Sequence, residues 1–199
     1  KFDLVKPNGW KTITLTEDIE YSLMNIIDGR KVSWSTDAIV YDEQPITFKQ
    51  SWTQRSRWTV GHLQCMKHYT KDLAEGVAKH KTLMNFDGLL YMFGIPVMLV
   101  TLLLLGVNTL LFMGNEMTTF DLVVSYAKYL ASTFIVPIMI AIVIMKLDKR
   151  DIKPMWFGLL CYPLFMGSWI LINLKCIINP NTKWEKINHV RDIKIREVA

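Results

Sequence analysis

Hydrophobic residues are concentrated in three long runs after Gly88. The runs cover residues 88–112, 123–145 and 156–178, and charged side chains are rare within them. Each run exceeds the ~20 residues that an α-helix needs to cross the hydrocarbon core of a bilayer. The pattern predicts three transmembrane helices. We expect a multi-pass protein of the plasma membrane.

The part of the chain before the apolar runs has shorter hydrophobic patterns, which predict separate helices and strands. Apolar side chains recur at helical spacing between Thr16, a good N-cap, and Gly29, a typical helix terminator, which predicts a helix over about 17–28. The β-branched and aromatic content of residues 31–35 and 38–41 predicts short strands. We therefore expect an α/β fold in this part of the chain.

A second helix is predicted over residues 48–59. On it Gln54, Arg57 and Trp58 stand at positions i, i+3 and i+4, so they point to one side. Residues 61–87 then mix apolar side chains with lysines, which is typical of an amphipathic helix in the membrane interface. A soluble helix packed on the preceding domain would give the same pattern.

Positive charge lies mainly beside the apolar runs. The net charge of +5 could indicate nucleic acid, but lysines that border membrane helices favour anionic headgroups instead, and no nucleic-acid partner is expected. The basic loop 146–153 predicts a cytoplasmic location for that loop and for residues 1–87. If all three predicted helices crossed the membrane, the basic tail would lie outside the cell. The excess of basic residues in cytoplasmic segments would instead place it inside, so the side of the membrane on which the tail lies stays open. The expected organisation is residues 1–60, 61–87, 88–178 and the tail 179–199.

Cysteine and histidine indicate neither a disulfide framework nor a metal site. The three cysteines form no CxxC pair, and the four histidines lack the spacing of metal ligands. The chain opens with Lys1 rather than methionine, and we expect it to be the C-terminal part of a longer protein.

Several short motifs follow one another in a characteristic order. They are Gly9-Trp10, Thr14-Leu15-Thr16-Glu17-Asp18, Ala38-Ile39-Val40-Tyr41-Asp42-Glu43-Gln44-Pro45, Phe48-Lys49-Gln50, and QxxRW at Gln54, Arg57 and Trp58. With them the chain resembles the processive family-2 glycosyltransferases, the membrane synthases of cellulose, hyaluronan, chitin and poly-N-acetylglucosamine. Three spans after QxxRW and a Trp-rich last span are most similar to the poly-N-acetylglucosamine synthases. The resemblance implies that residues 1–60 are the C-terminal part of a GT-A catalytic domain.

The resemblance also implies roles that suit the chemistry of these residues. Asp18 would be the general base that takes the proton of the acceptor hydroxyl, with Glu17 beside it in the catalytic motif. Arg57 and Gln54 would bind the diphosphate of the leaving group through charge-assisted and neutral hydrogen bonds. Trp58 would offer a flat apolar face to the acceptor sugar.

The same resemblance implies cofactors and partners. The donor would be a UDP-sugar, and Mg²⁺ or Mn²⁺ would be held by a DxD motif upstream of Lys1, so no metal ligands are expected in this chain. The other expected partners are a polysaccharide acceptor, the lipid bilayer and an accessory membrane or periplasmic subunit.

The leading hypothesis is an inverting transferase that adds a hexose or N-acetylhexosamine to a growing extracellular polysaccharide and extrudes it. One alternative keeps this chemistry but makes a single transfer to a lipid or lipid-linked acceptor. Another is a non-catalytic scaffold or transporter subunit, which few intramembrane charges disfavour.

Overall fold

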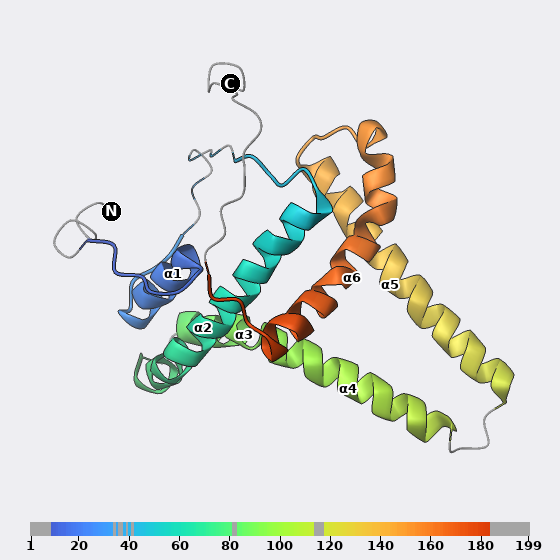
Figure 1. Ribbon diagram of the computed structural model, residues 1–199, viewed down its shortest axis with the longest axis horizontal. Helices are drawn as coiled ribbons and strands as arrows, with labels where there is room; N and C mark the ends of the chain where they lie inside the picture. Colours follow the sequence, from blue (N-terminus) through green and yellow to red (C-terminus); the bar gives the residue numbers. More distant parts are fainter. Residues whose placement is uncertain are drawn as a thin grey trace. The chain divides into compact units, whose positions relative to one another are not determined.

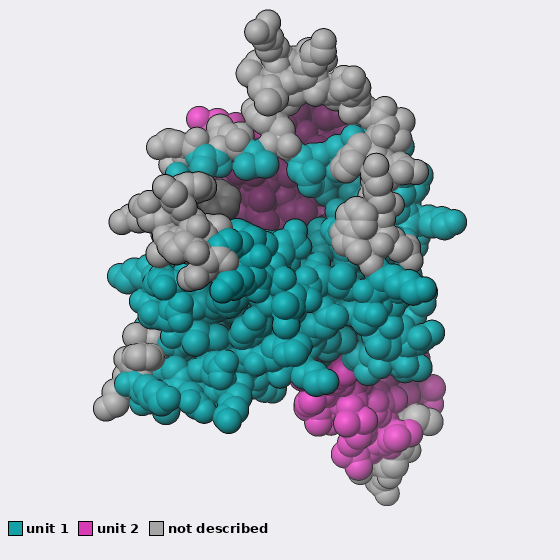
Figure 2. Space-filling view, turned by 60° about the vertical axis from the view of Figure 1, so that its left-hand side comes forward, with its two compact units in different colours: residues 1–95, 172–199 teal, residues 96–171 magenta. Residues whose placement is uncertain are grey.

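The computed structural model describes residues 9–33, 35, 38, 40, 42–80, 83–113 and 118–183. The chain divides into two compact units, which Figure 2 colours separately. Unit 1 comprises Lys1–Ile95 and Ile172–Ala199, and unit 2 comprises Pro96–Leu171.

Within the described residues, unit 1 contains three complete helices and the end of a helix from later in the chain. The first three are α1 (Glu17–Ile27), α2 (Phe48–His80) and α3 (Leu83–Met92), and all three contact one another (Figure 1). The last turns of α6 (Trp156–Ile178) also belong to this unit. The core between α1, α2 and α3 contains the buried side chains of Leu23, Cys65, Leu73 and Met92.

The predicted helix over 17–28 is confirmed as α1. Its first turn carries acidic side chains, which the positive end of the helix dipole favours. It ends where Gly29 adopts a φ of 75°, and the N–H of Arg30 reaches back to the carbonyl of Asn25 at 2.8 Å. Thr16 occupies the N-cap position, but its side chain makes no capping hydrogen bond.

The helix predicted over 48–59 does not stop there, because α2 continues to His80. Cys65 and Leu73 on its later turns are buried against α1 and α3, with Met66 and Tyr69 packed around them. For the face of α2 that carries Cys65 and Leu73, these contacts favour a helix packed on the rest of unit 1 over a helix in the membrane interface. An interfacial position for residues 61–87 stays a prediction.

The first predicted span, 88–112, is interrupted. α3 ends at Met92, and α4 (Gly94–Met113) begins after Phe93. Pro96 explains the break, because it has no N–H to bond the carbonyl of Met92 and its ring crowds that carbonyl. The part before Phe93 packs in unit 1, where Gly88 and Met92 are buried.

Unit 2 holds most of the membrane-length helices. These are α4, α5 (Thr119–Leu147) and α6, and a short 3₁₀ turn, η2 (Lys153–Met155), precedes α6. The segments Gly94–Leu111, Thr119–Leu147 and Lys153–Ile178 are long and apolar enough to cross a membrane. The prediction of three such segments is therefore confirmed, with the first one starting later than expected.

The α/β expectation is wrong for the described part of the chain, which is helical and contains no strand. Residues 31–33, 35, 38 and 40 form no regular structure, and the other residues of the two predicted strands lie outside the described ranges. The reason is physical: β-branched residues favour a strand only where a neighbouring strand accepts their hydrogen bonds. Here Val40 is 86% exposed and meets no such partner.

Candidate functional site

The segment that precedes α1 is held by a buried carboxylate. Glu20 is fully buried, and its oxygens accept hydrogen bonds from the N–H groups of Ile13 at 2.9 Å and Thr14 at 2.7 Å. The Tyr69 hydroxyl on α2 donates a third bond at 2.6 Å. Burial opposes ionisation of Glu20, but these hydrogen bonds outweigh it and lower the pKa below its usual value. Glu20 therefore ties the Thr14–Asp18 motif to α1 and α2.

A glycine on α2 lets this segment approach closely. A Cβ at Gly61 would stand 2.5 Å from the Thr16 side chain and 2.8 Å from its backbone nitrogen. The Leu15 N–H also donates to Gln64 Oε1 on α2 at 3.0 Å. Gly61 follows Arg57 and Trp58 by four and three residues, so all three share one face of the helix. The Thr14–Asp18 motif, called the acidic motif below, therefore contacts α2 one helical turn from QxxRW.

The two acids of the motif are exposed at the start of α1. Asp18 Oδ1 accepts the N–H of Ile19 at 2.8 Å, and the Ser22 hydroxyl donates to the Asp18 carbonyl. Burial raises the pKa of the Tyr91 hydroxyl on α3, and the charge of Asp18 raises it further. The Asp18 carboxylate is therefore close enough to Tyr91 on α3 to influence it electrostatically. Glu17 beside it is exposed as well.

Gln54 and Arg57 line a pocket in unit 1, whereas Trp58, Asp18 and Glu17 do not. The Trp58 ring is 39% exposed on the same helix. Arg55, which the QxxRW pattern leaves without a role, is buried and lies over the Phe48 ring at 5.6 Å. The structure thus brings the two predicted diphosphate ligands into one pocket and places the predicted base on the neighbouring element.

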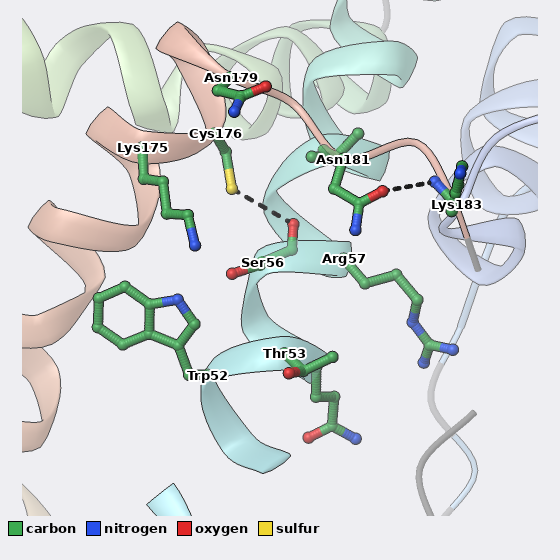
Figure 3. A pocket seen from close by; sticks show the side chains of 11 residues that line it. Trp52, Thr53, Ser56, Arg57, Lys175, Cys176, Asn179, Asn181 and Lys183 are labelled. Atoms are coloured by element: carbon green, nitrogen blue, oxygen red, sulfur yellow. Dashed lines mark hydrogen bonds between the residues drawn. The ribbon is translucent and has the colours of Figure 1, made fainter. Parts of the chain in front are cut away.

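The pocket combines α2 with the end of α6 and the residues that follow it (Figure 3). Three of its lining side chains are cationic, and no acidic side chain lines it. The lining residues are Trp52, Thr53, Gln54, Ser56, Arg57, Val60, Lys175, Cys176, Asn179, Asn181 and Lys183.

The end of α6 is fixed on α2 by buried polar and apolar contacts. The Thr59 hydroxyl donates to Asn173 Oδ1 at 2.8 Å, and both residues are buried. The Cys176 thiol donates to the Ser56 carbonyl at 3.6 Å. Val60, Ile172 and Cys176 form a small core with Leu15 and Trp52 packed against it. A residue of the acidic motif, Leu15, therefore packs against a core formed by α2 and α6.

His62 supports the break between α3 and α4. Its Nε2 lies 3.1 Å from the Met92 carbonyl, which can only accept, so Nε2 carries the hydrogen. This bond satisfies the carbonyl that Pro96 leaves without a helical partner. Burial lowers the pKa of His62, and the bond to Met92 offsets this only in part. The neutral ring also meets Tyr91 edge-on, at a centroid distance of 5.1 Å.

The described residues do not build a metal site. Among them, no group of three His, Cys, Asp or Glu side chains could hold a metal ion. The expected Mg²⁺ or Mn²⁺ ligands were placed upstream of Lys1, so that expectation stays a prediction and no step is derived through a metal.

Sequence reasoning missed four residues of this site. No local motif singles out Glu20 or Gly61, and Lys175 lies near the end of the third predicted span. Lys183 was assigned to the basic tail. The sequence shows that Glu20 lies two residues after Asp18, but it does not show that Glu20 accepts hydrogen bonds from Tyr69 and from the N–H of Ile13. Contacts across such sequence distances leave no local pattern.

Comparison with known protein families gives a match. The family model described as "Glycosyl transferase family group 2" matches residues 3–170. Neither a curated protein nor a solved structure matches the chain. The matched segment contains the acidic motif, QxxRW and most of the membrane-length helices.

Proposed function

Because the chain belongs to glycosyl transferase family group 2, we propose that it transfers a hexose or N-acetylhexosamine from a UDP-sugar to a growing extracellular polysaccharide, with inversion. The polymer would leave through the membrane, with the catalytic part on the cytoplasmic side. Family membership implies a glycosyltransferase with a nucleotide-sugar donor and an acceptor. The UDP-sugar, the processive polymer and the likeness to poly-N-acetylglucosamine synthases are the parts proposed here.

One observation carries the proposal. Thr16 sits against Gly61, so the motif that ends in Asp18 and the motif that contains Arg57 and Trp58 lie on touching elements. A base for the acceptor and a cation for the leaving group must act on two sides of one sugar carbon. This packing supports that arrangement, because only one helical turn of α2 separates Gly61 from Arg57.

In the proposed reaction, Asp18 accepts the proton of an acceptor hydroxyl while the oxygen attacks C1 of the donor sugar. The bond between C1 and the diphosphate oxygen breaks, and the nucleoside diphosphate leaves with its electron pair. Exposure keeps Asp18 open to an acceptor. Glu17, its neighbour in the motif, would keep the site anionic on this side.

Arg57 and Gln54 would bind the leaving diphosphate, because its negative charge grows as the bond to C1 breaks. Trp58 would stack on the acceptor sugar through its exposed ring. Glu20 and Gly61 would act through position, because they fix the backbone of the acidic motif on α2.

A transfer to a lipid-linked acceptor is the second candidate function. One observation favours it: the cationic pocket includes the last turn of α6, a helix of membrane length. Product size separates the two candidates. A ladder of polymers on a gel supports the polysaccharide, whereas a single glycolipid spot on a thin-layer plate supports the lipid-linked acceptor.

The test of the base is Asp18→Asn in the full-length protein in membranes, supplied with a radiolabelled UDP-sugar. We expect sugar incorporation to fall by about 10²–10⁴-fold, the usual contribution of a general base. Asp28→Asn is the matched control, since Asp28 is an exposed aspartate at the other end of α1 that pairs with Arg30 at 2.8 Å. Normal incorporation by Asp18→Asn at normal expression would remove Asp18 from the mechanism.

A further inference from the structure

Beyond the predicted ligands Gln54 and Arg57, the pocket contains cations from the far end of the chain. Lys175 comes from the last turn of α6, and Lys183 comes from the segment after it. Figure 3 shows Lys175 reaching from α6 towards the turn of α2 that carries Ser56, with Arg57 on the other side of that turn. Positive charge therefore flanks the pocket from both elements.

Two buried donors at the pocket point to an anionic ligand. The Ser56 hydroxyl and the Arg57 Nε are both inaccessible to solvent, and neither makes a hydrogen bond within the described part of the chain. Buried polar atoms normally have a partner, and leaving one unpaired is costly. Both can donate to an oxygen acceptor. A phosphate oxygen beside Arg57 would satisfy this requirement.

The rest of the lining fits the same ligand. Asn179 and Asn181 add neutral amides, and the Asn181 Oδ1 already accepts the backbone N–H of Lys183 at 3.0 Å, which holds that segment in a turn. The cavity has a volume of about 150 Å³. One water takes ~30 Å³ in the liquid, so this space suits a group of several heavy atoms such as a diphosphate.

We propose that Lys175 and Lys183 are further diphosphate ligands, which complete in this pocket the set of cations begun by Arg57. The inference rests on the proposed function and extends it, because it makes the end of α6 part of the binding site. The diphosphate has two candidate sources, the nucleoside diphosphate of the donor and the diphosphate of a lipid-linked acceptor.

The experiment measures the binding of inorganic pyrophosphate to the purified full-length protein in detergent by titration calorimetry. The variants are Lys175→Gln, Lys183→Gln and the double variant. We expect each single substitution to weaken binding about threefold to tenfold, and the double variant to weaken it by more than tenfold. Arg57→Gln should weaken binding as well.

Lys146→Gln is the matched control, because Lys146 occupies the last turn of α5 as Lys175 does in α6. It should bind pyrophosphate like the unmodified protein. Equal melting temperatures would show that the variants are folded. Unchanged affinity in the double variant, an equal loss in Lys146→Gln, or no pyrophosphate binding by the unmodified protein would each overturn the proposal.

Competition then identifies the source of the diphosphate. Displacement of pyrophosphate by UDP assigns the pocket to the donor, and displacement by farnesyl diphosphate assigns it to a lipid-linked acceptor. Displacement by neither would overturn the site. Sugar incorporation by Asp18→Asn tests the proposed function separately, because Asp18 does not line the pocket and its substitution should leave pyrophosphate affinity unchanged.

Discussion

The two units of this protein bury their side chains in different ways. In unit 1, charged and polar groups such as Glu20, Thr59 and Asn173 are buried together with apolar ones. In unit 2, Pro163 is the only described residue that is buried, and large apolar side chains such as Leu103 and Ile140 are more than half exposed.

This difference shows what surrounds the polar and apolar groups of each unit. Unit 1 satisfies its buried polar groups with protein, through hydrogen bonds that fix the acidic motif and the pocket. The helices of unit 2 satisfy their backbone internally and leave an apolar exterior, which is the condition that hydrocarbon imposes. We therefore expect unit 1 to depend on the exact positions of its side chains. We expect unit 2 to depend mainly on the apolar character of its helices.

A pair of Gly→Ala substitutions should show the difference between the two units most clearly. In a helix this change usually stabilises by up to about 1 kcal/mol. At Gly106 in α4 nothing lies within 4 Å of the added Cβ, so that gain should appear. At Gly61 the Cβ would meet Thr16 at 2.5 Å. We expect a loss of about 1–3 kcal/mol there, with sugar transfer reduced about 100-fold as the acidic motif moves.

Melting in detergent and incorporation of labelled sugar would measure both effects. If Gly61→Ala is as active and as stable as Gly106→Ala, then the acidic motif does not depend on its contact with α2.

A charge placed on α4 tests whether its exposed face meets lipid. Leu103 is 66% exposed near the middle of this helix. Leu103→Lys should oppose membrane insertion by about 3 kcal/mol, whereas Leu103→Ala should be tolerated. Insertion of the segment into microsomes, scored by a glycosylation reporter, measures the difference. Equal insertion of both variants would show that this face does not lie in hydrocarbon.

Glu20→Gln should weaken unit 1 without changing its shape. An amide offers one acceptor oxygen where three donors converge, so one N–H or hydroxyl loses its partner and stability falls by about 1–3 kcal/mol. The lowered pKa of Glu20 means that its contribution is present above pH 4.5 and is lost as pH falls below that value.

Thermal unfolding at pH 7 and at pH values below 4.5 would follow this loss, and the difference between the two proteins should shrink as pH falls through that range. Glu75→Gln, on an exposed helix face with Lys71 and Lys79, is the control and should leave the melting temperature unchanged. A stable Glu20→Gln protein would show that the network does not hold the motif.

The smallest expected effect concerns His62. Its lowered pKa means that the folded protein resists protonation, so stability should decline as pH falls below 6.5, where the unfolded chain takes up a proton and the folded protein does not. His62→Gln should flatten this part of the stability profile, whereas His68→Gln, on an exposed part of α2, should not. A decline of the same size in His62→Gln would assign it to other groups.

Local signals were sufficient for α1 and for the shared face of Gln54, Arg57 and Trp58, since caps and helical spacing act within a few residues. They failed for residues 31–35 and 38–41, because strand propensity depends on a neighbouring strand. The break at Phe93 was also missed, because Pro96 lies inside an apolar run that reads as continuous.

The pocket could be predicted only in part. QxxRW indicated Gln54 and Arg57, but Lys175 and Lys183 lie more than a hundred residues further along the chain. The end of α6 is held on α2 by contacts such as the bond between Thr59 and Asn173, which no periodicity reveals.

That bond joins residues 114 positions apart, so it has a consequence for biosynthesis. A ribosome has made both sequence motifs long before it reaches Asn173, yet the partner of Thr59 does not exist until then. The pocket is complete only once the end of α6 has been synthesised and has packed on α2. Translation order therefore makes this pocket a late-forming feature of unit 1.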